Sequence, residues 1–233
     1  QAGHIVRNAR DRLLNPGRLI RTGNTPFEVL HDNGLVKLRY YAPATIDADA
    51  APLVPLVIVP PLAVNMLVYD LFPERSFVRH FTALGFPVYL IDWGSPGLQQ
   101  AHYTLSTYVK RLMPEFITKV REHSGQATLS LQGWSMGGGL CLAYTAYHQD
   151  KNIRNIITTG TAIDGHANGV LGRQYQVLSQ WLSRLRLNAR KIPASMAYSP
   201  GWVNVIGFKL SDPVGSMRGY RDLLMNLHDR EYV

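Results

Sequence analysis

The sequence predicts an α/β protein with a mostly parallel sheet and helices on both of its faces. From residue 53 to residue 159, strand-like and helix-like segments alternate, which is typical of parallel strands joined by right-handed crossovers. The pentapeptide Gly133-Trp134-Ser135-Met136-Gly137 lies where one such strand passes into a helix. These two observations define the predicted core.

Two kinds of segment precede the alternation. Residues 4–20 carry apolar residues among arginines and predict a weak amphipathic helix. Residues 27–30 and 35–40 predict the strands of a hairpin, because Asn33-Gly34 between them is the pair that two-residue hairpin turns favour.

The alternation begins with residues 53–59, an apolar run that is rich in Val and Ile and too short for a typical helix. Such a run predicts a buried strand. The same reasoning from length and spacing predicts helices over residues 75–84, 104–123 and 136–147, and strands over residues 87–93, 128–131 and 153–159.

Beyond Asp164 the pattern changes, and no convincing Val/Ile-rich strand follows. Residues 178–185 and 220–227 predict helices, separated by prolines and scattered aromatic residues. We expect this region to form a cap over the site. The predicted domains are a basic N-terminal helical segment at residues 1–25, a core with the first six strands at residues 26–164, and a cap or lid at residues 165–233.

The pentapeptide has the pattern Gly-x-Ser-x-Gly, which predicts the nucleophile elbow of the α/β-hydrolase fold when a strand precedes it and a helix follows. In such a turn the serine has strained backbone geometry and an exposed hydroxyl. Gly133 and Gly137 leave room where Cβ atoms would collide with the neighbouring strand and helix. The alternative is a chance Gly/Ser turn. The flanking segments favour Ser135 as a nucleophile.

Acyl transfer at Ser135 also requires donors for the oxyanion. One predicted donor is the backbone amide of Met136, and the other comes from the loop at residues 60–65. Because Pro60 and Pro61 have no amide hydrogen, the second donor is Leu62, with Ala63 as the alternative.

A histidine base and a carboxylate should follow the serine along the chain, and the sequence offers weak candidates. His148 ends the helix after the elbow, His166 closely follows the strand at residues 153–159, and His228 lies near the end of the cap. Asp164 is the better placed acid, although a structural role is the simpler explanation for it. We expect the Asp and His to come from a C-terminal segment outside these 233 residues or from a second chain.

Composition restricts the class of protein. The 233 residues are 46% hydrophobic, enough for one sizeable core. The single cysteine, Cys141, excludes a disulfide framework and is interpreted as a core thiol. No apolar run of eighteen residues predicts a membrane span, and no signal peptide is recognised, so a cytoplasmic location is expected. No metal, cofactor or prosthetic group is implied, and the sequence leaves a homo-oligomer open.

The formal net charge is +8, and the basic residues form two groups. Such groups are solvated helix faces or attract anionic partners. No zinc-ligand pattern or aromatic-interleaved basic stripe indicates nucleic acid. For the second group, the functional alternative is that it binds the phosphates of an acyl-coenzyme A carrier. The first group is Arg7, Arg10, Arg12, Arg18 and Arg21, and the second is Arg184, Arg186, Arg190 and Lys191.

The chain resembles the poly(3-hydroxyalkanoate) synthases from about residue 55 to its end. The resemblance is most specific in residues 60–94, which include Pro60-Pro61-Leu62-Ala63-Val64-Asn65 and Gly85-Phe86-Pro87-Val88-Tyr89-Leu90-Ile91-Asp92-Trp93-Gly94, and it continues in the elbow. These enzymes polymerise hydroxyacyl-coenzyme A through a cysteine, and Ser135 occupies the matching position here. The resemblance implies an α/β-hydrolase fold and an acyl substrate.

The leading hypothesis is a serine-dependent esterase or thioesterase that acts on hydroxyacyl or other acyl esters, with Ser135 as nucleophile. A polyester synthase that uses serine is the first alternative. It ranks behind hydrolysis because a serine ester is a poorer acyl donor than a thioester. A non-catalytic binding subunit that keeps the fold is the second.

Overall fold

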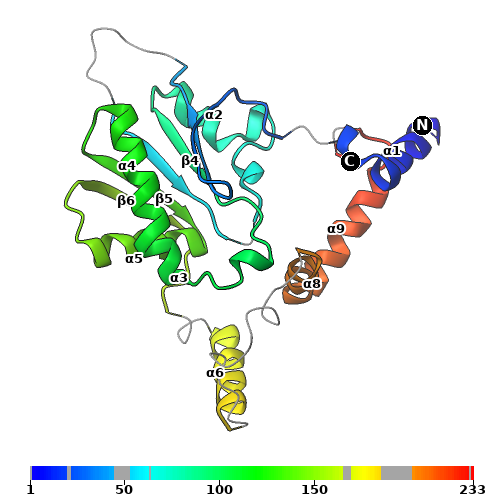
Figure 1. Cartoon of the computed structure of the whole chain (residues 1–233). Coiled ribbons are helices and arrows are strands. Elements are labelled where there is room, and N and C mark those ends of the chain that lie inside the picture. The colour runs from blue at the N-terminus through cyan, green and yellow to red at the C-terminus, as the bar shows by residue number, and fades with distance from the viewer. Residues whose placement is uncertain are drawn as a thin grey trace. The chain divides into compact units, whose positions relative to one another are not determined.

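The structure of the chain is a computed structural model (Figure 1). It describes residues 2–19, 22–44, 53–62, 64–164, 169–184, 201–230 and 232–233. The chain divides into two compact units. One comprises residues 23–198, and the other comprises residues 1–22 together with residues 199–233.

The larger unit is built on a six-stranded sheet in the order β1-β2-β4-β3-β5-β6. The β1/β2 and β2/β4 pairs are antiparallel, whereas β4/β3, β3/β5 and β5/β6 are parallel. The predicted class, a mostly parallel sheet entered through a hairpin, is confirmed. The strands are β1 (Glu28–Asp32), β2 (Lys37–Tyr41), β3 (Leu56–Val59), β4 (Val88–Asp92), β5 (Leu129–Trp134) and β6 (Ile153–Thr159).

Helices connect the parallel strands, as expected. α2 (Phe77–Ala83) lies between β3 and β4, and α5 (Met136–His148) lies between β5 and β6. The connection from β4 to β5 contains α3 (Leu105–Thr107), the π-helical turn η5 (Tyr108–Leu112) and α4 (Met113–Ser124). α6 (Gly169–Arg184) follows β6, and short 3-10 turns are η2 (Met66–Tyr69), η3 (Pro73–Arg75) and η4 (Leu98–Gln100).

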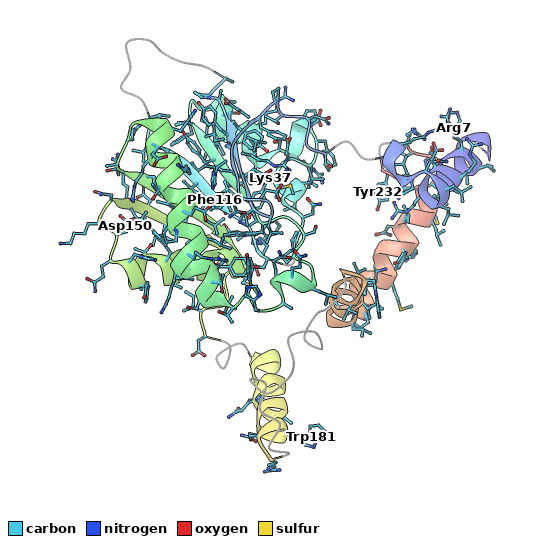
Figure 2. All side chains as sticks on the ribbon, viewed as in Figure 1. Arg7, Lys37, Phe116, Asp150, Trp181 and Tyr232 are labelled. Atoms are coloured by element: carbon cyan, nitrogen blue, oxygen red, sulfur yellow. The ribbon has the colours of Figure 1, made fainter. Side chains whose placement is uncertain are left out.

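Two apolar clusters cover the two faces of the sheet, because successive side chains of a strand point to opposite faces. Val57 and Val59 belong to the larger cluster, which α4 and α5 complete, whereas Ile58 between them belongs to the smaller cluster beside α2. Phe116 of α4 is fully buried in the larger cluster (Figure 2). Since β3 and β4 are buried throughout, the continuous apolar runs in the sequence are explained.

The hairpin turn differs from the two-residue turn that Asn33-Gly34 predicts. Asp32 pairs with Lys37, so four residues lie between the paired positions. The Asn33 side chain explains the longer loop, because its Oδ1 accepts hydrogen bonds from the amides of Leu35 and Val36 at 3.3 and 2.9 Å. This local side-chain cap competes with the tighter turn.

The helix predicted over residues 104–123 is interrupted by η5. The Met113 amide donates to the carbonyl oxygen of Tyr108, five residues earlier. Pro114 has no amide hydrogen with which to continue the α-helical ladder, and the wider turn precedes it. Gly125, in the left-handed region at φ 66°, ends α4.

The smaller unit joins the two ends of the chain. Its helices are α1 (Ala2–Leu14), α8 (Gly201–Ser211) and α9 (Pro213–Met225), with the 3-10 turn η1 at Pro16–Arg18. Asn8 Nδ2 donates to the Leu227 carbonyl at 2.9 Å, and Arg230 Nη1 donates to Asp11 Oδ2 at 2.9 Å. The N-terminal segment therefore packs with residues that the sequence assigned to a separate cap. The role of a cap stays a prediction.

Two helical features of this unit were missed from the sequence. α8 lies where only scattered aromatic residues were recognised, because β-branched residues such as Val203 and Val205 are weak helix formers. α9 begins earlier than expected, at Pro213. Asp212 explains that start, since its Oδ1 accepts from the Gly215 amide at 2.8 Å and Pro213 fits the first turn. In the described residues no helix is long and apolar enough to cross a membrane.

Asp150 yields a prediction about acid stability. Its carboxylate accepts two hydrogen bonds from Arg121 Nη2 at 2.9 and 2.8 Å and one from the Tyr144 hydroxyl at 2.7 Å (Figure 2). Burial alone would raise the pKa of Asp150, but the hydrogen bonds from Tyr144, Arg121 and the Asn152 amide outweigh it and hold this pKa below 3.8. The contribution of Asp150 to folding is therefore present above pH 3.8 and is lost as the pH falls through the lowered pKa.

We expect the urea midpoint of the wild type to exceed that of Asp150→Asn at neutral pH. The difference should shrink between about pH 5 and about pH 2, because protonation removes the charge in the wild type as well. The matched control is Glu74→Gln at an exposed position, which should follow the wild type throughout. A constant difference between wild type and Asp150→Asn over this range would contradict the prediction.

Candidate active site

Ser135 lies in the turn between β5 and α5 with φ 52° and ψ −122°. Among the described residues, Gln149 is the other non-glycine residue with positive φ. The Ser135 amide donates to the Thr159 carbonyl at 2.8 Å, and the Ser135 carbonyl accepts from the Gly138 amide at 3.1 Å. The backbone is therefore held on both sides in a conformation that costs energy for any residue with a Cβ atom. Its side chain is exposed and does not cap α5.

The glycines of the pentapeptide are required by close backbone contacts. A Cβ atom on Gly137 would lie 2.0 Å from the Val59 carbonyl oxygen, and one on Gly133 would lie 2.4 Å from the Gly138 amide nitrogen. Such distances are far inside van der Waals contact. The local geometry expected of a nucleophile elbow, a strained and exposed serine between tightly packed glycines, is therefore present.

The same contacts bring the start of α5 against the end of β3. Gly137 touches the Val59 carbonyl and Pro60, so the loop that follows β3 begins beside the elbow. Leu62 is half-buried and packs against the larger apolar cluster, while Ala63 lies outside the described residues. Within the described part of the chain, no acceptor is recorded for the amide of Met136 or of Leu62. Their role as oxyanion donors stays a prediction.

A buried indole holds the loop after β3. Trp93 Nε1 donates to the Pro60 carbonyl at 2.8 Å, and the Trp93 side chain is 4% exposed. The preceding Asp92 pairs with Arg39 at 2.6 Å and accepts from the Gly94 amide at 3.0 Å. Asp92 therefore has a structural role, although Asp-Trp-Gly resembles the turn of an aspartate nucleophile.

Three buried polar atoms near the elbow have no hydrogen-bond partner among the described residues. They are the Tyr69 hydroxyl, Gln132 Oε1 and Thr161 Oγ1. The Tyr69 ring meets the Trp134 ring edge-on at 6.2 Å, and burial raises the pKa of Tyr69 above its ordinary value. Thr161 Oγ1 lies 2.0 Å from the position that a Cβ on Gly138 would take. No local sequence pattern predicted this polar lining, because its residues come from the 3-10 turn η2, strand β5 and the segment after β6.

Of the histidines named from the sequence, only His148 is a described residue of the larger unit, and its recorded contacts do not include the elbow. His148 ends α5, where its Nε2 donates to the Val109 carbonyl at 3.1 Å and its ring packs on Tyr144. His228 lies in a turn after α9, in the smaller unit, and His166 lies outside the described residues. Asp164 follows β6 and is exposed. Within the larger unit, no Ser-His-acid arrangement at Ser135 is recorded among the described residues.

The remaining candidates from the sequence have structural surroundings. Cys141 is fully buried in the larger cluster, and burial raises its pKa to about 12, so it is the core thiol that was predicted.

In the first basic group, Arg10 and Arg18 lie within 3.9 Å of Asp11. In the second, Arg184 ends α6, and the other members lie outside the described residues. Among the described residues no cluster of His, Cys, Asp and Glu suits a metal.

A parallel sheet with a strained serine at a strand-to-helix turn defines the class of protein, an α/β hydrolase. Residues 54–196 match the family described as alpha/beta hydrolase fold, and the chain belongs to this family.

Comparison with curated proteins shows which members of this family the chain is similar to. The chain is 33% identical over 214 residues to the poly(3-hydroxyalkanoate) polymerase subunit PhaC of Haloarcula marismortui, covering 88% of this chain and 42% of that protein. For the subunit of Haloferax mediterranei the identity is 30%, covering 92% and 42%, and for that of Allochromatium vinosum it is 35%, covering 66% and 42%. The resemblance to poly(3-hydroxyalkanoate) synthases is confirmed, and the chain spans less than half the length of these relatives.

The contact at Gly137 predicts which glycine of the elbow tolerates a side chain. Gly137→Ala should lower the free energy of unfolding by about 3 kcal/mol or more, because the new Cβ meets backbone atoms that cannot move away. Gly139→Ala is the matched control in the same helix: nothing lies within 4 Å of its Cβ position. That change should stabilise the helix by about 0.5–1 kcal/mol. Urea unfolding measures both, and equal effects would contradict the close approach.

Proposed function

We propose that this protein is a serine-dependent acyl-transfer enzyme of the esterase or thioesterase type. Its substrate is an acyl ester or acyl-coenzyme A that carries a hydroxyacyl or another acyl group. The observation that carries the proposal is the backbone of Ser135, strained at φ 52° with its side chain exposed. Strain of this kind persists where the surrounding structure over-determines it, and it concentrates at active sites.

The proposed reaction has two steps. Ser135 Oγ attacks the acyl carbonyl carbon while its proton passes to a histidine base, and the carbonyl oxygen becomes an oxyanion. The amides of Met136 and Leu62 donate hydrogen bonds to that oxyanion. Collapse breaks the bond to the leaving alcohol or thiol, which takes the proton from the histidine. Water then attacks the acyl-serine and gives its proton to the same histidine. Collapse of this second oxyanion releases the acid, and the histidine returns the proton to Ser135 Oγ.

The histidine and the carboxylate that orients it are proposed to lie outside these 233 residues, in a C-terminal segment or a second chain. Two observations support this. Three histidines of the larger unit, His31, His123 and His148, bond to Glu115, Tyr89 and Val109 instead of Ser135. The curated relatives are also more than twice as long as the part that matches.

A poly(3-hydroxyalkanoate) synthase with a serine nucleophile is the alternative that the relatives favour. The two activities differ in what accepts the acyl group. In hydrolysis the acceptor is water, and in synthesis it is the hydroxyl of the growing chain. A non-catalytic subunit with the same fold is the third candidate, supported by the lack of a recorded hydrogen bond between a histidine and Ser135 among the described residues of the larger unit.

The test of the nucleophile is labelling with a fluorophosphonate, read by intact mass and peptide mapping. The wild type should gain one adduct at Ser135, and Ser135→Ala should gain none while its melting temperature stays unchanged. Ser135→Gly should also lose the adduct and gain about 1 kcal/mol of stability, because glycine relieves the positive φ. An adduct that persists in Ser135→Ala would refute the assignment. An unlabelled wild type in a preparation whose intact mass includes a further segment or second chain would favour the binding subunit.

Incubation with 3-hydroxybutyryl-coenzyme A distinguishes hydrolysis from synthesis. We expect the wild type to release free hydroxyacid, since an ester of Ser135 is a weaker acyl donor than a thioester. Ser135→Cys should shift the product towards insoluble polymer, because the thiolate forms a thioester. The released coenzyme A thiol measures turnover in both. Polymer from the wild type would favour the synthase instead.

A further inference from the structure

A hollow of ≈ 320 Å³ lies beside the helical segment that follows β4. It is formed by one stretch of chain, does not include the elbow, and has no carboxylate in its lining. The lining residues are His102, Thr104, Ser106, Thr107, Lys110 and Arg111.

The two cations of this hollow are not neutralised by acidic side chains. Within the described residues no Asp or Glu pairs with Lys110 or Arg111. Farther along the same segment, Lys119 pairs with Glu122 at 2.7 Å and Arg121 pairs with Asp150 at 2.8 Å. The unpaired cations are therefore a local property of the hollow and not of the whole helix.

Aromatic rings hold both cations in place. Lys110 Nζ lies 4.3 Å from the centre of the Tyr147 ring, and Arg111 Cζ lies 5.1 Å from that of Tyr103. A ring attracts the cation through its face but takes up few of its N–H donors. Both side chains thus keep donors for another acceptor while losing little further conformational freedom when they bind it.

The backbone gives a reason why these two cations share one side of the helix. They lie in η5, where hydrogen bonds span five residues instead of four, so a turn contains more residues. Consecutive side chains consequently diverge less around the axis than in an α-helix. π-helical turns are rare and are frequent at functional sites.

Neutral donors complete the lining. Thr107 Oγ1 accepts from the Thr104 amide at 3.1 Å and lies 3.4 Å from Thr104 Oγ1, so one hydroxyl hydrogen of this pair remains for another acceptor. The Ser106 hydroxyl has no recorded partner among the described residues. A set of hydroxyls, a guanidinium, an ammonium and an imidazole without any acidic side chain matches a ligand with several anionic oxygens.

We propose that this hollow binds the phosphate groups of a small phosphate-bearing molecule, with Lys110 and Arg111 as its main contacts. Arg111 would bind two oxygens of one phosphate, Lys110 would contact a neighbouring phosphate as a point charge, and the threonine and serine hydroxyls would donate to the remaining oxygens. The volume is at the lower end of the range for ligand pockets, so it accommodates a diphosphate group, and the rest of the ligand projects outward. The site does not depend on the role of Ser135.

The test is isothermal titration of the whole chain with ADP as the phosphate probe and adenosine as the probe without phosphates. The wild type should bind ADP saturably and should not bind adenosine. The double variant Lys110→Gln/Arg111→Gln should bind ADP at least about tenfold more weakly. Because both side chains are exposed, its melting temperature should match the wild type.

The matched control is Lys119→Gln/Arg154→Gln, which removes the same charge from a half-buried position of α4 and an exposed position of β6. It should keep the wild-type affinity for ADP. Absence of saturable ADP binding, equal affinity for adenosine, or an equal loss in both double variants would overturn the site. Labelling of Ser135 is expected to be the same in all of these variants, so failure here does not bear on the proposed nucleophile.

Discussion

The approach of α5 to β3 is the contact on which the elbow depends. The first turn of this helix lies so close to the Val59 carbonyl that no Cβ fits at Gly137. Because β3 is a buried strand in the middle of the sheet, its end is fixed by pairing with both β4 and β5. The helix cannot move away without losing that packing. Ser135, at the junction, accordingly takes a backbone conformation that its own preferences oppose.

The surroundings of the elbow add to this constraint. Trp93 holds Pro60 in the loop after β3, and Thr159 at the end of β6 accepts from the Ser135 amide. Loops that follow three parallel strands therefore meet at one edge of the sheet, the place where α/β proteins bind ligands. The unpartnered polar atoms of Tyr69, Gln132 and Thr161 lie at this edge. Buried polar groups without partners are costly in a folded protein, and their grouping at the elbow fits a site that is polar for a chemical reason.

Prediction from the sequence succeeded where the signal is local. The buried strands were found because β3 is apolar along its whole length and β4 is apolar from Val88 to Ile91. The elbow was found because its glycines have a fixed spacing. Prediction failed where a single side chain or a segment distant in the sequence determines the local structure. Asn33 lengthens the hairpin turn through its own hydrogen bonds, and Pro114 accompanies the π-helical turn. The packing of α1 with the end of the chain rests on pairs such as Arg230 with Asp11, more than two hundred residues apart.

The sequence by itself determined the alternation of strands and helices in the core, the α/β-hydrolase class and the place of the Gly-x-Ser-x-Gly turn. Each of these follows from periodicity and residue size within a short window. Only the tertiary structure decided which polar groups surround Ser135 and which cations lack acidic partners. Arg121 pairs with Asp150, whereas Lys110 and Arg111 have no acidic partner among the described residues. The difference depends on which loops pack beside each turn of the helix. Whether a charged side chain is compensated depends on which side chains lie close to it in space, and not on their spacing along the chain.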